Sequence, residues 1–218
     1  METKTNQLKR ILLNWYKNNK RSFSWRNTND PWKILLIEII SQQTQINRAN
    51  TYYQKFVKKF PTPESMSKSS LKTILKMWSG LGYNIRAKRI YESSKILAEK
   101  GFEEIYPNFE LLPGVGQYTK NAILSFAYGD KVLAVDTNLE RIITRYFGVD
   151  NAKDYVRKYS NLLLEDINSK DLNQAFMDFG SSICTSSKTK CDICPLEKSC
   201  KKYFINSKNS TKKFKGSN

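Results

Sequence analysis

The chain has 218 residues, enough to bury a hydrophobic core in one domain or in two small ones. Its 37 lysines and arginines outnumber 20 aspartates and glutamates, and the formal net charge of +17 favours a polyanionic partner. We find no signal peptide, no lipidation motif and no apolar run approaching the roughly 20 residues of a membrane-spanning helix, so we expect nucleic acid rather than a membrane as that partner.

Helical periodicity runs from the N-terminus through most of the chain, and no segment alternates as a strand does. Asp30 followed by Pro31 is typical of an N-cap with proline at the first helical position, so a helix should begin there. Other apolar stripes before residue 100 lie within 8–16, 46–60 and 71–78, and 84–99 continues as a helix with a basic face.

One acid interrupts the most apolar of these helices. In "ILLIEIISQQT", residues 34–44, Glu38 lies about two turns after Pro31. Burying a carboxylate is costly unless it is paired, and the usual response is a raised pKa. The chain contains no histidine, so acid–base chemistry falls to carboxylates, tyrosine or lysine. Glu38 is therefore either a proton donor or a residue on a solvated stripe.

The segment "LPGVGQYT" combines two close glycines with an immediate helix start. Gly114 and Gly116 allow the backbone to approach a ligand, and a helix N-terminus directs N–H groups outward. This arrangement is typical of phosphate binding. The alternative is an ordinary turn between helices, and the basic charge of the chain favours phosphate.

The second half of the chain is also helical. Thr137 and Glu140 match a capping box, which predicts a helix from residue 137 with Thr137 as its cap. Two more amphipathic helices are predicted at about 152–166 and 171–183. The last 18 residues contain six lysines and no acid, so we expect residues 204–218 to be a disordered tail.

All four cysteines, Cys184, Cys191, Cys194 and Cys200, fall in one segment with the spacing C-x6-C-x2-C-x5-C. Clustered cysteines without a secretory signal indicate a metal rather than disulfides. Zinc ribbons usually have two tight C-x2-C pairs, and only one pair here is tight, so an iron–sulfur cluster is favoured over zinc. The cluster's role, redox chemistry or structural staple, stays open.

Several motifs occur together in one order along the chain. "PWKILLIEIISQQTQ", "GLGYNIRAKRI", "LPGVGQYT", "VDTN" and "NQAFMDFGSSIC" are followed by the cysteine segment, and "SFSWR" lies near residue 25. This combination resembles the helix–hairpin–helix DNA glycosylase superfamily and, within it, the adenine DNA glycosylase branch. The resemblance covers roughly residues 5–203.

The resemblance implies an all-α fold with a six-helix domain at 25–132 and an iron–sulfur domain that joins 1–24 to 133–203. It implies a flipped-out base in a cleft between these domains and a [4Fe-4S] cluster on the four cysteines. The partner would be double-stranded DNA containing a mismatch. We expect a cytoplasmic, nucleoid-associated monomer.

The resemblance also implies roles for single residues. Glu38 would protonate a purine ring nitrogen of the leaving base, following the two-carboxylate logic of glycoside hydrolysis. Asp136 would stabilise the oxocarbenium ion or act as a transient nucleophile. Its alternative is helix capping, from which the predicted cap at Thr137 leaves it free, and Asn138 would orient Asp136 or the substrate. Tyr118 stands where bifunctional relatives carry an amine that forms a Schiff base, which implies a monofunctional enzyme.

DNA contacts follow from the same resemblance. Gln43 and Tyr83 match the residues that fill the space left by a flipped base. The candidate phosphate contacts are Arg86, Lys88 and Arg89, together with the hairpin glycines Gly114 and Gly116. Each basic residue has the alternative of being ordinary solvated surface.

Two features depart from a standard adenine glycosylase. The sequence ends soon after the cysteines, so we expect a short form without the C-terminal domain that recognises oxidised guanine, and Thr137 replaces the usual glycine of "VDTN". Adenine opposite guanine or oxidised guanine is the first expected substrate. The alternatives are thymine or uracil opposite guanine, or a DNA-binding iron–sulfur protein without catalysis.

Overall fold

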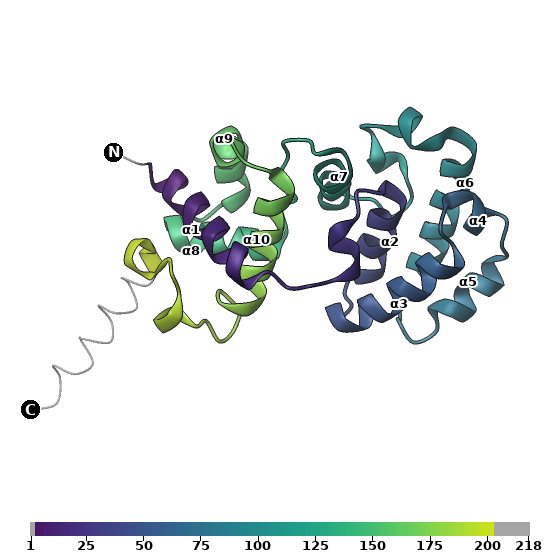
Figure 1. Cartoon of the computed structure of the whole chain (residues 1–218), viewed down its shortest axis with the longest axis horizontal. Coiled ribbons are helices and arrows are strands. Elements are labelled where there is room, and N and C mark those ends of the chain that lie inside the picture. Colours follow the sequence, from purple (N-terminus) through teal and green to yellow (C-terminus); the bar gives the residue numbers. More distant parts are fainter. Residues whose placement is uncertain (1–2, 203–218) are drawn as a thin grey trace, which may run out of the picture. The chain divides into compact units, whose positions relative to one another are not determined.

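The structure is a computed structural model and describes residues 3–202 (Figure 1). These residues form ten α-helices with short 3-10 turns and one short π-helix, and they contain no strand, which confirms the all-α prediction. None of the described helices is long and apolar enough to cross a membrane. The predicted disordered tail, 204–218, lies outside the described residues.

The contacts divide the chain into two compact units. One is Ser22–Ala134, and the other joins the N-terminal segment up to Arg21 with the chain from Val135 onward. The first contains α2 (Pro31–Ser41), α3 (Ile46–Lys59), α4 (Pro63–Ser67), α5 (Leu71–Trp78), α6 (Ile85–Ile105) and α7 (Gln117–Ile123). The second contains α1 (Lys4–Asn19), α8 (Thr137–Phe147), α9 (Ala152–Leu164) and α10 (Ser169–Ser182).

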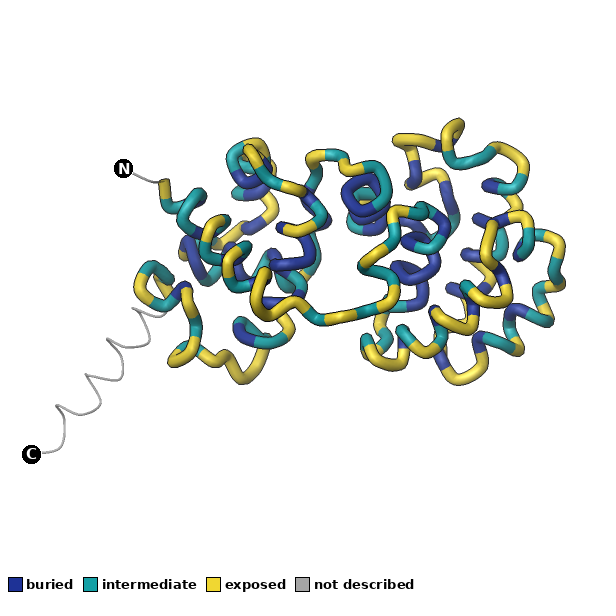
Figure 2. The backbone as a smooth tube through the Cα atoms, viewed as in Figure 1, coloured by how far each residue is buried: buried dark blue, intermediate teal, exposed yellow. Residues whose placement is uncertain are grey.

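Helix α2 forms the centre of the unit Ser22–Ala134. It packs against α3, α6 and α7, and every side chain from Ile34 to Ile40 is buried, so the tube of α2 is mostly dark blue in Figure 2. A helix that is apolar on all sides is stable only when neighbours cover it on all sides. The composition of α2 therefore dictates its central place.

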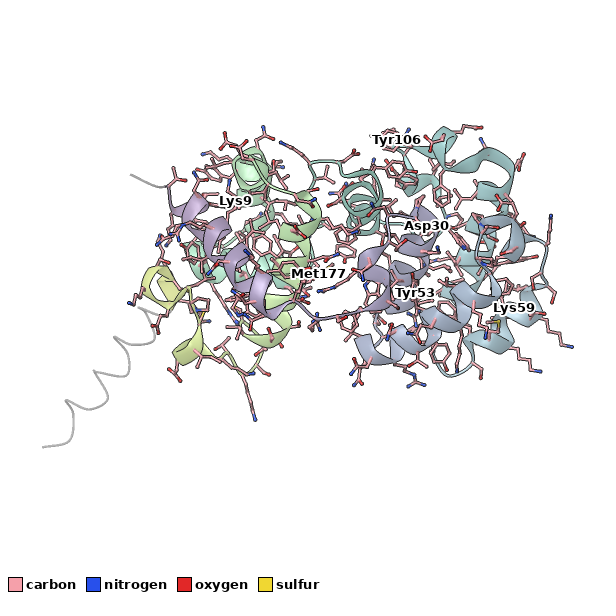
Figure 3. The ribbon with its side chains drawn as sticks, viewed as in Figure 1. Lys9, Asp30, Tyr53, Lys59, Tyr106 and Met177 are labelled. Atoms are coloured by element: carbon pink, nitrogen blue, oxygen red, sulfur yellow. The ribbon has the colours of Figure 1, made fainter. Side chains whose placement is uncertain are left out.

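The start of α2 confirms the predicted cap. Asp30, labelled in Figure 3, accepts hydrogen bonds from the backbone N–H groups of Trp32 at 2.9 Å and Lys33 at 3.2 Å. Pro31 occupies the first helical turn, where its missing N–H costs no hydrogen bond. The indole of Trp32 also donates to the carbonyl of Phe60 at 2.9 Å, which ties α2 to the end of α3.

In the second unit, α1 packs against α9 and α10, and α8 packs against the same two helices. Leu8 and Leu12 of α1 are fully buried. Lys9, labelled in Figure 3, donates to the carbonyls of Leu162 at 3.2 Å and Glu165 at 2.9 Å, and thereby caps the end of α9. The predicted helices at 152–166 and 171–183 correspond to α9 and α10.

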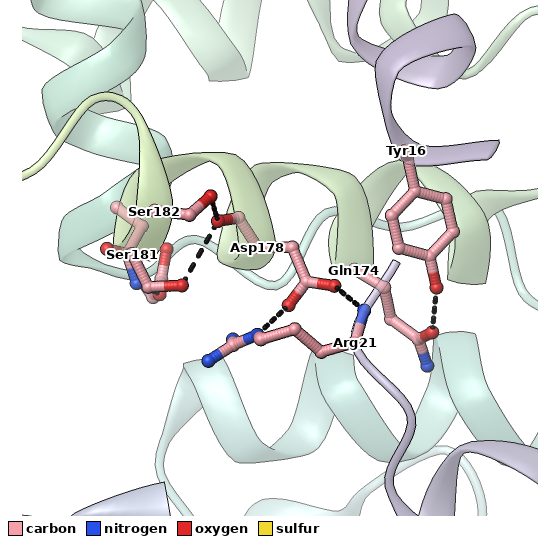
Figure 4. A network of polar contacts seen from close by, with 8 residues as sticks. Tyr16, Arg21, Gln174, Asp178, Ser181 and Ser182 are labelled. Carbon is pink, nitrogen blue, oxygen red and sulfur yellow. Dashed lines mark hydrogen bonds and ion pairs between the residues drawn. The ribbon is translucent and has the colours of Figure 1, made fainter. Parts of the chain in front are cut away.

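A buried carboxylate holds the segment that follows α1 (Figure 4). Asp178 of α10 is fully buried and accepts hydrogen bonds from the Arg21 side chain at 2.6 Å and the Arg21 backbone N–H at 3.0 Å. One turn earlier, Tyr16 donates to Gln174 at 2.6 Å. Because a buried charge is tolerated only when it is paired, this network fixes where the first segment joins its unit.

Candidate active site

Glu38 lies in the buried middle of α2. Its exposed fraction is 8%, and its neighbours on both sides of the helix are fully or nearly fully buried. Its carbonyl oxygen accepts a hydrogen bond from the Ser41 hydroxyl at 3.1 Å. The alternative that Glu38 lies on a solvated stripe is therefore excluded.

Tyr118 lies in the first turn of α7, which packs against the helix that carries Glu38. The nearest amine along the chain is Lys120, which forms an ion pair with Glu110 at 2.8 Å, and only 17% of its side chain is exposed. Asn121, on the same helix, donates to the carbonyl of Leu133 at 2.8 Å and anchors α7 to the segment that leaves the unit. Tyr118 is thus presented by a firmly held helix whose lysine is already paired.

Asp136 is itself the N-cap of α8, so the prediction that Thr137 caps this helix is wrong by one residue, and Asp136 is not free of the capping role as expected. Asp136 has an extended backbone, and its Oδ1 accepts a hydrogen bond from the N–H of Leu139 at 2.8 Å. Aspartate caps helices at least as well as threonine, so the residue directly before the first turn takes the role. Thr137 is the first helical residue.

The second carboxylate oxygen of Asp136 accepts a hydrogen bond from the Asn138 amide at 2.6 Å. Burial raises the pKa of Asp136 above its ordinary value, and the bonds from Leu139 and Asn138 limit the rise. An environment of this kind makes a bare carboxylate less stable than in water. A cation forming beside Asp136 would relieve that cost.

Two residues that the sequence analysis missed hold Asn138 in place. A Cβ atom on Gly180 of α10 would lie 2.5 Å from the Cβ of Asn138, so only glycine permits this approach. Arg141 donates from one Nη to the Asn138 side chain at 2.7 Å and the Gly180 carbonyl at 2.8 Å, and from Nε to the Cys184 carbonyl at 2.7 Å. A glycine inside a helix costs about 1 kcal/mol relative to alanine, which was the available signal for Gly180.

The four cysteines line one cavity of about 40 Å³, and Cys184 lies just beyond the end of α10. All four are free thiols. Burial raises the pKa of the Cys194 thiol to about 12, so a thiolate there needs compensating positive charge. Arg145 of α8 donates to the sulfur of Cys184 at 3.4 Å.

These features fit a [4Fe-4S] cluster. The four thiols line the same cavity. Among residues 3–202, no three His, Cys, Asp or Glu side chains are close enough to share a single metal ion. The remaining wall of the cavity is largely apolar and includes Phe179, Ile183 and Leu196. Four cysteine thiolates that line one cavity can serve as the ligands of an iron–sulfur cluster.

Gln43 and Tyr83 share an uncommon backbone conformation. Gln43 has φ +51° and Tyr83 has φ +46°, in the left-handed region that side chains rarely adopt. Both residues are exposed, and the exposed fraction of Tyr83 is 66%. Strained residues of this kind occur most often at functional sites, because the surrounding structure must hold them there.

The glycine hairpin borders an open groove of about 520 Å³, lined by Lys88, Arg89, Gly114 and Gly116 among others. Gly114 has φ +85°, and a Cβ there would lie 3.0 Å from the Arg89 side chain. The Gln42 side chain donates to the Gly114 carbonyl at 3.3 Å, which joins the hairpin to the end of α2. Lys88 and Arg89 are exposed, as a phosphate contact requires.

Arg86 does not fit its predicted role. Its exposed fraction is 4%, and its guanidinium donates to backbone carbonyls, including those of Ile40 and Leu81 at 3.0 Å each. A side chain committed to internal acceptors cannot also bind a phosphate on the surface. The expectation of a phosphate contact at Arg86 is therefore wrong.

Comparisons with known proteins agree with this arrangement. Residues 36–165 match the family HhH-GPD superfamily base excision DNA repair protein. The adenine DNA glycosylase of Buchnera aphidicola subsp. Baizongia pistaciae is 39% identical over 204 residues, which are 89% of this chain and 58% of that protein. The chain therefore spans less than two thirds of the length of this curated relative.

Solved structures show the same fold. The structure of a thermostable thymine-DNA glycosylase superposes with a TM-score of 0.85 at 30% identity, over 93% of this chain and 97% of that one. A trapped endonuclease III–DNA covalent intermediate superposes with a TM-score of 0.74 at 23% identity, over 95% of this chain and 100% of that one. Because the family match covers more than half of its residues, the chain belongs to the HhH-GPD superfamily of base excision DNA repair proteins.

Proposed function

We propose that the protein is a monofunctional DNA glycosylase of base excision repair that removes adenine mispaired with guanine or oxidised guanine. The observation that carries the proposal is Glu38, an acid buried in the middle of an otherwise apolar helix. The identity of 39% to an adenine DNA glycosylase supports adenine as the base.

Hydrolysis of an N-glycosidic bond needs a protonated leaving base and negative charge beside the developing oxocarbenium ion. Glu38 supplies the proton, because an apolar environment keeps a carboxylic acid neutral near pH 7. Asp136 supplies the negative charge, and the bond from Asn138 keeps its carboxylate oriented. The proposal requires both acids to act on one nucleotide extruded from the duplex.

The reaction would end at an abasic site with an intact strand. A phenol cannot form a Schiff base, so Tyr118 provides no route to strand cleavage. Lys120 is engaged by Glu110 and does not replace the missing amine.

The substrate would be double-stranded DNA with a mismatch, bound by a monomer. The net charge of +17, the exposed pair Lys88 and Arg89 and the hairpin groove support a phosphate-binding surface. Endonuclease III, which shares the fold, has been solved in complex with DNA. Binding by phosphate contacts should weaken steeply as salt rises, with a slope proportional to the number of contacts.

When bound, a [4Fe-4S] cluster would close the Cys184–Cys200 segment as a covalent staple. Arg145 would stabilise the thiolate of Cys184 through its N–H···S bond. Arg141 would connect the same segment to Asn138.

A second candidate is removal of thymine or uracil opposite guanine. It is favoured by the TM-score of 0.85 and the near-complete coverage of the thymine-DNA glycosylase structure. Both candidates use the same acids, so only the excised base distinguishes them.

The test is a panel of duplexes carrying adenine opposite guanine, adenine opposite oxidised guanine, thymine opposite guanine and uracil opposite guanine. Products are separated with and without alkaline treatment. We expect alkali-dependent cleavage at adenine only. Cleavage at thymine or uracil alone would establish the second candidate, strand breaks without alkali would refute the monofunctional assignment, and binding without any excision would indicate a non-catalytic DNA-binding protein.

A further inference from the structure

Of the three non-glycine residues with positive φ in the described part of the chain, two, Gln43 and Tyr83, lie in different turns of the unit Ser22–Ala134. Gln43 follows the end of α2, and Tyr83 precedes the start of α6. Neither residue is glycine, so the left-handed conformation costs free energy at each and must be maintained by contacts from outside the turn.

A single side chain provides contacts to both turns. Arg86, in the first turn of α6, has two terminal nitrogens that face different acceptors. Nη1 lies within hydrogen-bonding distance of the carbonyls of Ile39 at 3.3 Å and Ile40 at 3.0 Å, the Thr44 hydroxyl at 3.1 Å and the Gln42 carbonyl. Nη2 donates to the carbonyls of Leu81 at 3.0 Å and Gly82 at 3.2 Å.

The positions of these acceptors matter more than their number. The Gln42 carbonyl belongs to the peptide group directly before Gln43, and the Gly82 carbonyl belongs to the peptide group directly before Tyr83. Arg86 therefore fixes one of the two peptide planes that define each positive φ. It also donates to carbonyls in the last turn of α2, where a helix end leaves acceptors without partners inside the helix.

Only arginine suits this position. A guanidinium is a rigid, planar fork that can donate in two directions at once, whereas a lysine ammonium is a single nitrogen. The guanidinium also makes cation–π contacts with the rings of Trp78 and Tyr83, whose centroids lie 5.3 and 5.8 Å from its central carbon. Tyr83 thus contacts Arg86 through its ring as well as through the adjacent peptide.

Helix α3 also supports the Tyr83 turn, through contacts to residues that precede Tyr83. The Tyr52 hydroxyl donates to the Ser79 carbonyl at 2.6 Å, and Arg48 donates to the Gly80 carbonyl. These bonds reach the Tyr83 turn only. Among the described residues, Arg86 is the side chain for which hydrogen bonds to both turns are seen.

We propose that Arg86 is a positioning residue that couples the Gln43 turn to the Tyr83 turn, so that the two side chains enter the duplex as one preorganised unit. The proposal deepens the proposed function and rests on it in one respect, the entry of Gln43 and Tyr83 into DNA. The coupling itself is a property of the free protein.

The first test therefore uses the cluster-containing full chain without DNA. Hydrogen–deuterium exchange is compared between the wild type, Arg86→Lys and the control Arg157→Lys, an exposed arginine on α9. In Arg86→Lys, exchange at 42–45 and at 80–84 should rise together by about tenfold, the effect of losing one or two hydrogen bonds. Loosening of only one turn, or of neither, would overturn the proposal.

The second test uses mismatched DNA with 2-aminopurine beside the target base as a reporter of base extrusion. The extrusion rate is measured for Gln43→Ala, for Tyr83→Ala and for the double variant. Each is made once with Arg86 intact and once with Arg86→Lys. In the wild type the two effects on the extrusion rate should be non-additive by about fivefold or more. In the Arg86→Lys background they should become additive. Additivity in both backgrounds would show that Arg86 is merely structural.

A variant without any change at Arg86 covers the case in which Arg86→Lys does not fold. Gln43→Gly removes the strain at one turn, because glycine adopts positive φ freely. Exchange should then change at 80–84 as well as at 42–45, and an unchanged 80–84 would contradict the coupling. If the exchange results hold while no duplex shows extrusion or excision, the proposed function fails and the coupling stands.

Discussion

The two units each carry one candidate catalytic acid, and they place it in different surroundings. Glu38 lies in the interior of a helix that is buried on every side. Asp136 stands at the first position before a helix, and both of its oxygens accept hydrogen bonds. Burial among apolar side chains suits an acid to carry a proton, whereas the N–H donors at Asp136 limit the rise in pKa that its burial causes.

The largest expected effect tests that division directly. Glu38→Gln and Asp136→Asn should each reduce excision at least a hundredfold, the usual contribution of general acid catalysis or more, while leaving mismatch binding within a few-fold of the wild type. Single-turnover excision and a binding titration measure the two quantities. Excision that survives in both variants would show that neither acid has its assigned role.

Gly180→Ala should damage the support of Asp136 without altering any charged group. The added Cβ would lie 2.5 Å from the Asn138 side chain, so α8 and α10 must separate. Overpacking of this kind costs about 1–3 kcal/mol of unfolding free energy. Excision should fall by about tenfold or more because Asn138 loses its place.

Ser181→Ala is the matched control, since Ser181 is the next residue of α10 and is exposed. It should change the unfolding free energy by no more than about 0.5 kcal/mol. Chemical denaturation and single-turnover excision compare the two variants. Equal behaviour of both would mean that the close approach at Gly180 has no role in holding Asn138.

Tyr118→Lys, in the unit Ser22–Ala134, should give the protein a small ability to form a covalent Schiff base with DNA. An amine in the first turn of α7 can attack the sugar carbon and form a Schiff base, which borohydride traps as a covalent protein–DNA product. The wild type should give no such product, because Lys120 is paired with Glu110. Trapping in the wild type at the same level would contradict the assignment of Tyr118.

The smallest effect concerns the pH dependence of stability. Because burial raises the pKa of Asp136, the folded protein binds this proton more tightly than the unfolded chain. The stability that the protonated group contributes is complete below the ordinary value of 3.8 and is lost as pH rises through the folded pKa. Asp136→Asn should lack this part of the pH dependence, so its Tm relative to that of the wild type should increase from pH 3.8 toward pH 7. If the Tm of Asp136→Asn instead increased relative to that of the wild type as pH falls, folding would lower the pKa of Asp136 and not raise it.

Local patterns in the sequence predicted local structure well. The cap at Asp30 and the proline at the first turn of α2 depend on neighbouring residues, and the structure shows both. For Glu38 the local pattern left burial and a solvated stripe open, and the structure shows burial. The cap of α8 was misplaced because aspartate and threonine compete for the same role at adjacent positions. Sequence signals of similar strength cannot decide between such neighbours.

Arg86 shows an error that the sequence could have prevented. It stands beside Lys88 and Arg89, and the run looks like one basic surface. At helical spacing, however, Arg86 shares its face with Ile90, Ser93 and Leu97, all of which are buried. Arg141 and Gly180 are a different case, because their contacts join segments about 40 residues apart and no local pattern encodes them.

The anchoring of Arg21 by Asp178 has a consequence for biosynthesis. Helix α1 leaves the ribosome before the segment Ser22–Ala134, whereas its packing partners α9 and α10 are translated after that segment. The segment Ser22–Ala134 can condense in the meantime, as nascent domains generally do. The apolar stripe with Leu8 and Leu12 must stay uncovered until translation has passed Asp178, and nascent chains halted before that point are the species most exposed to chaperones and proteases.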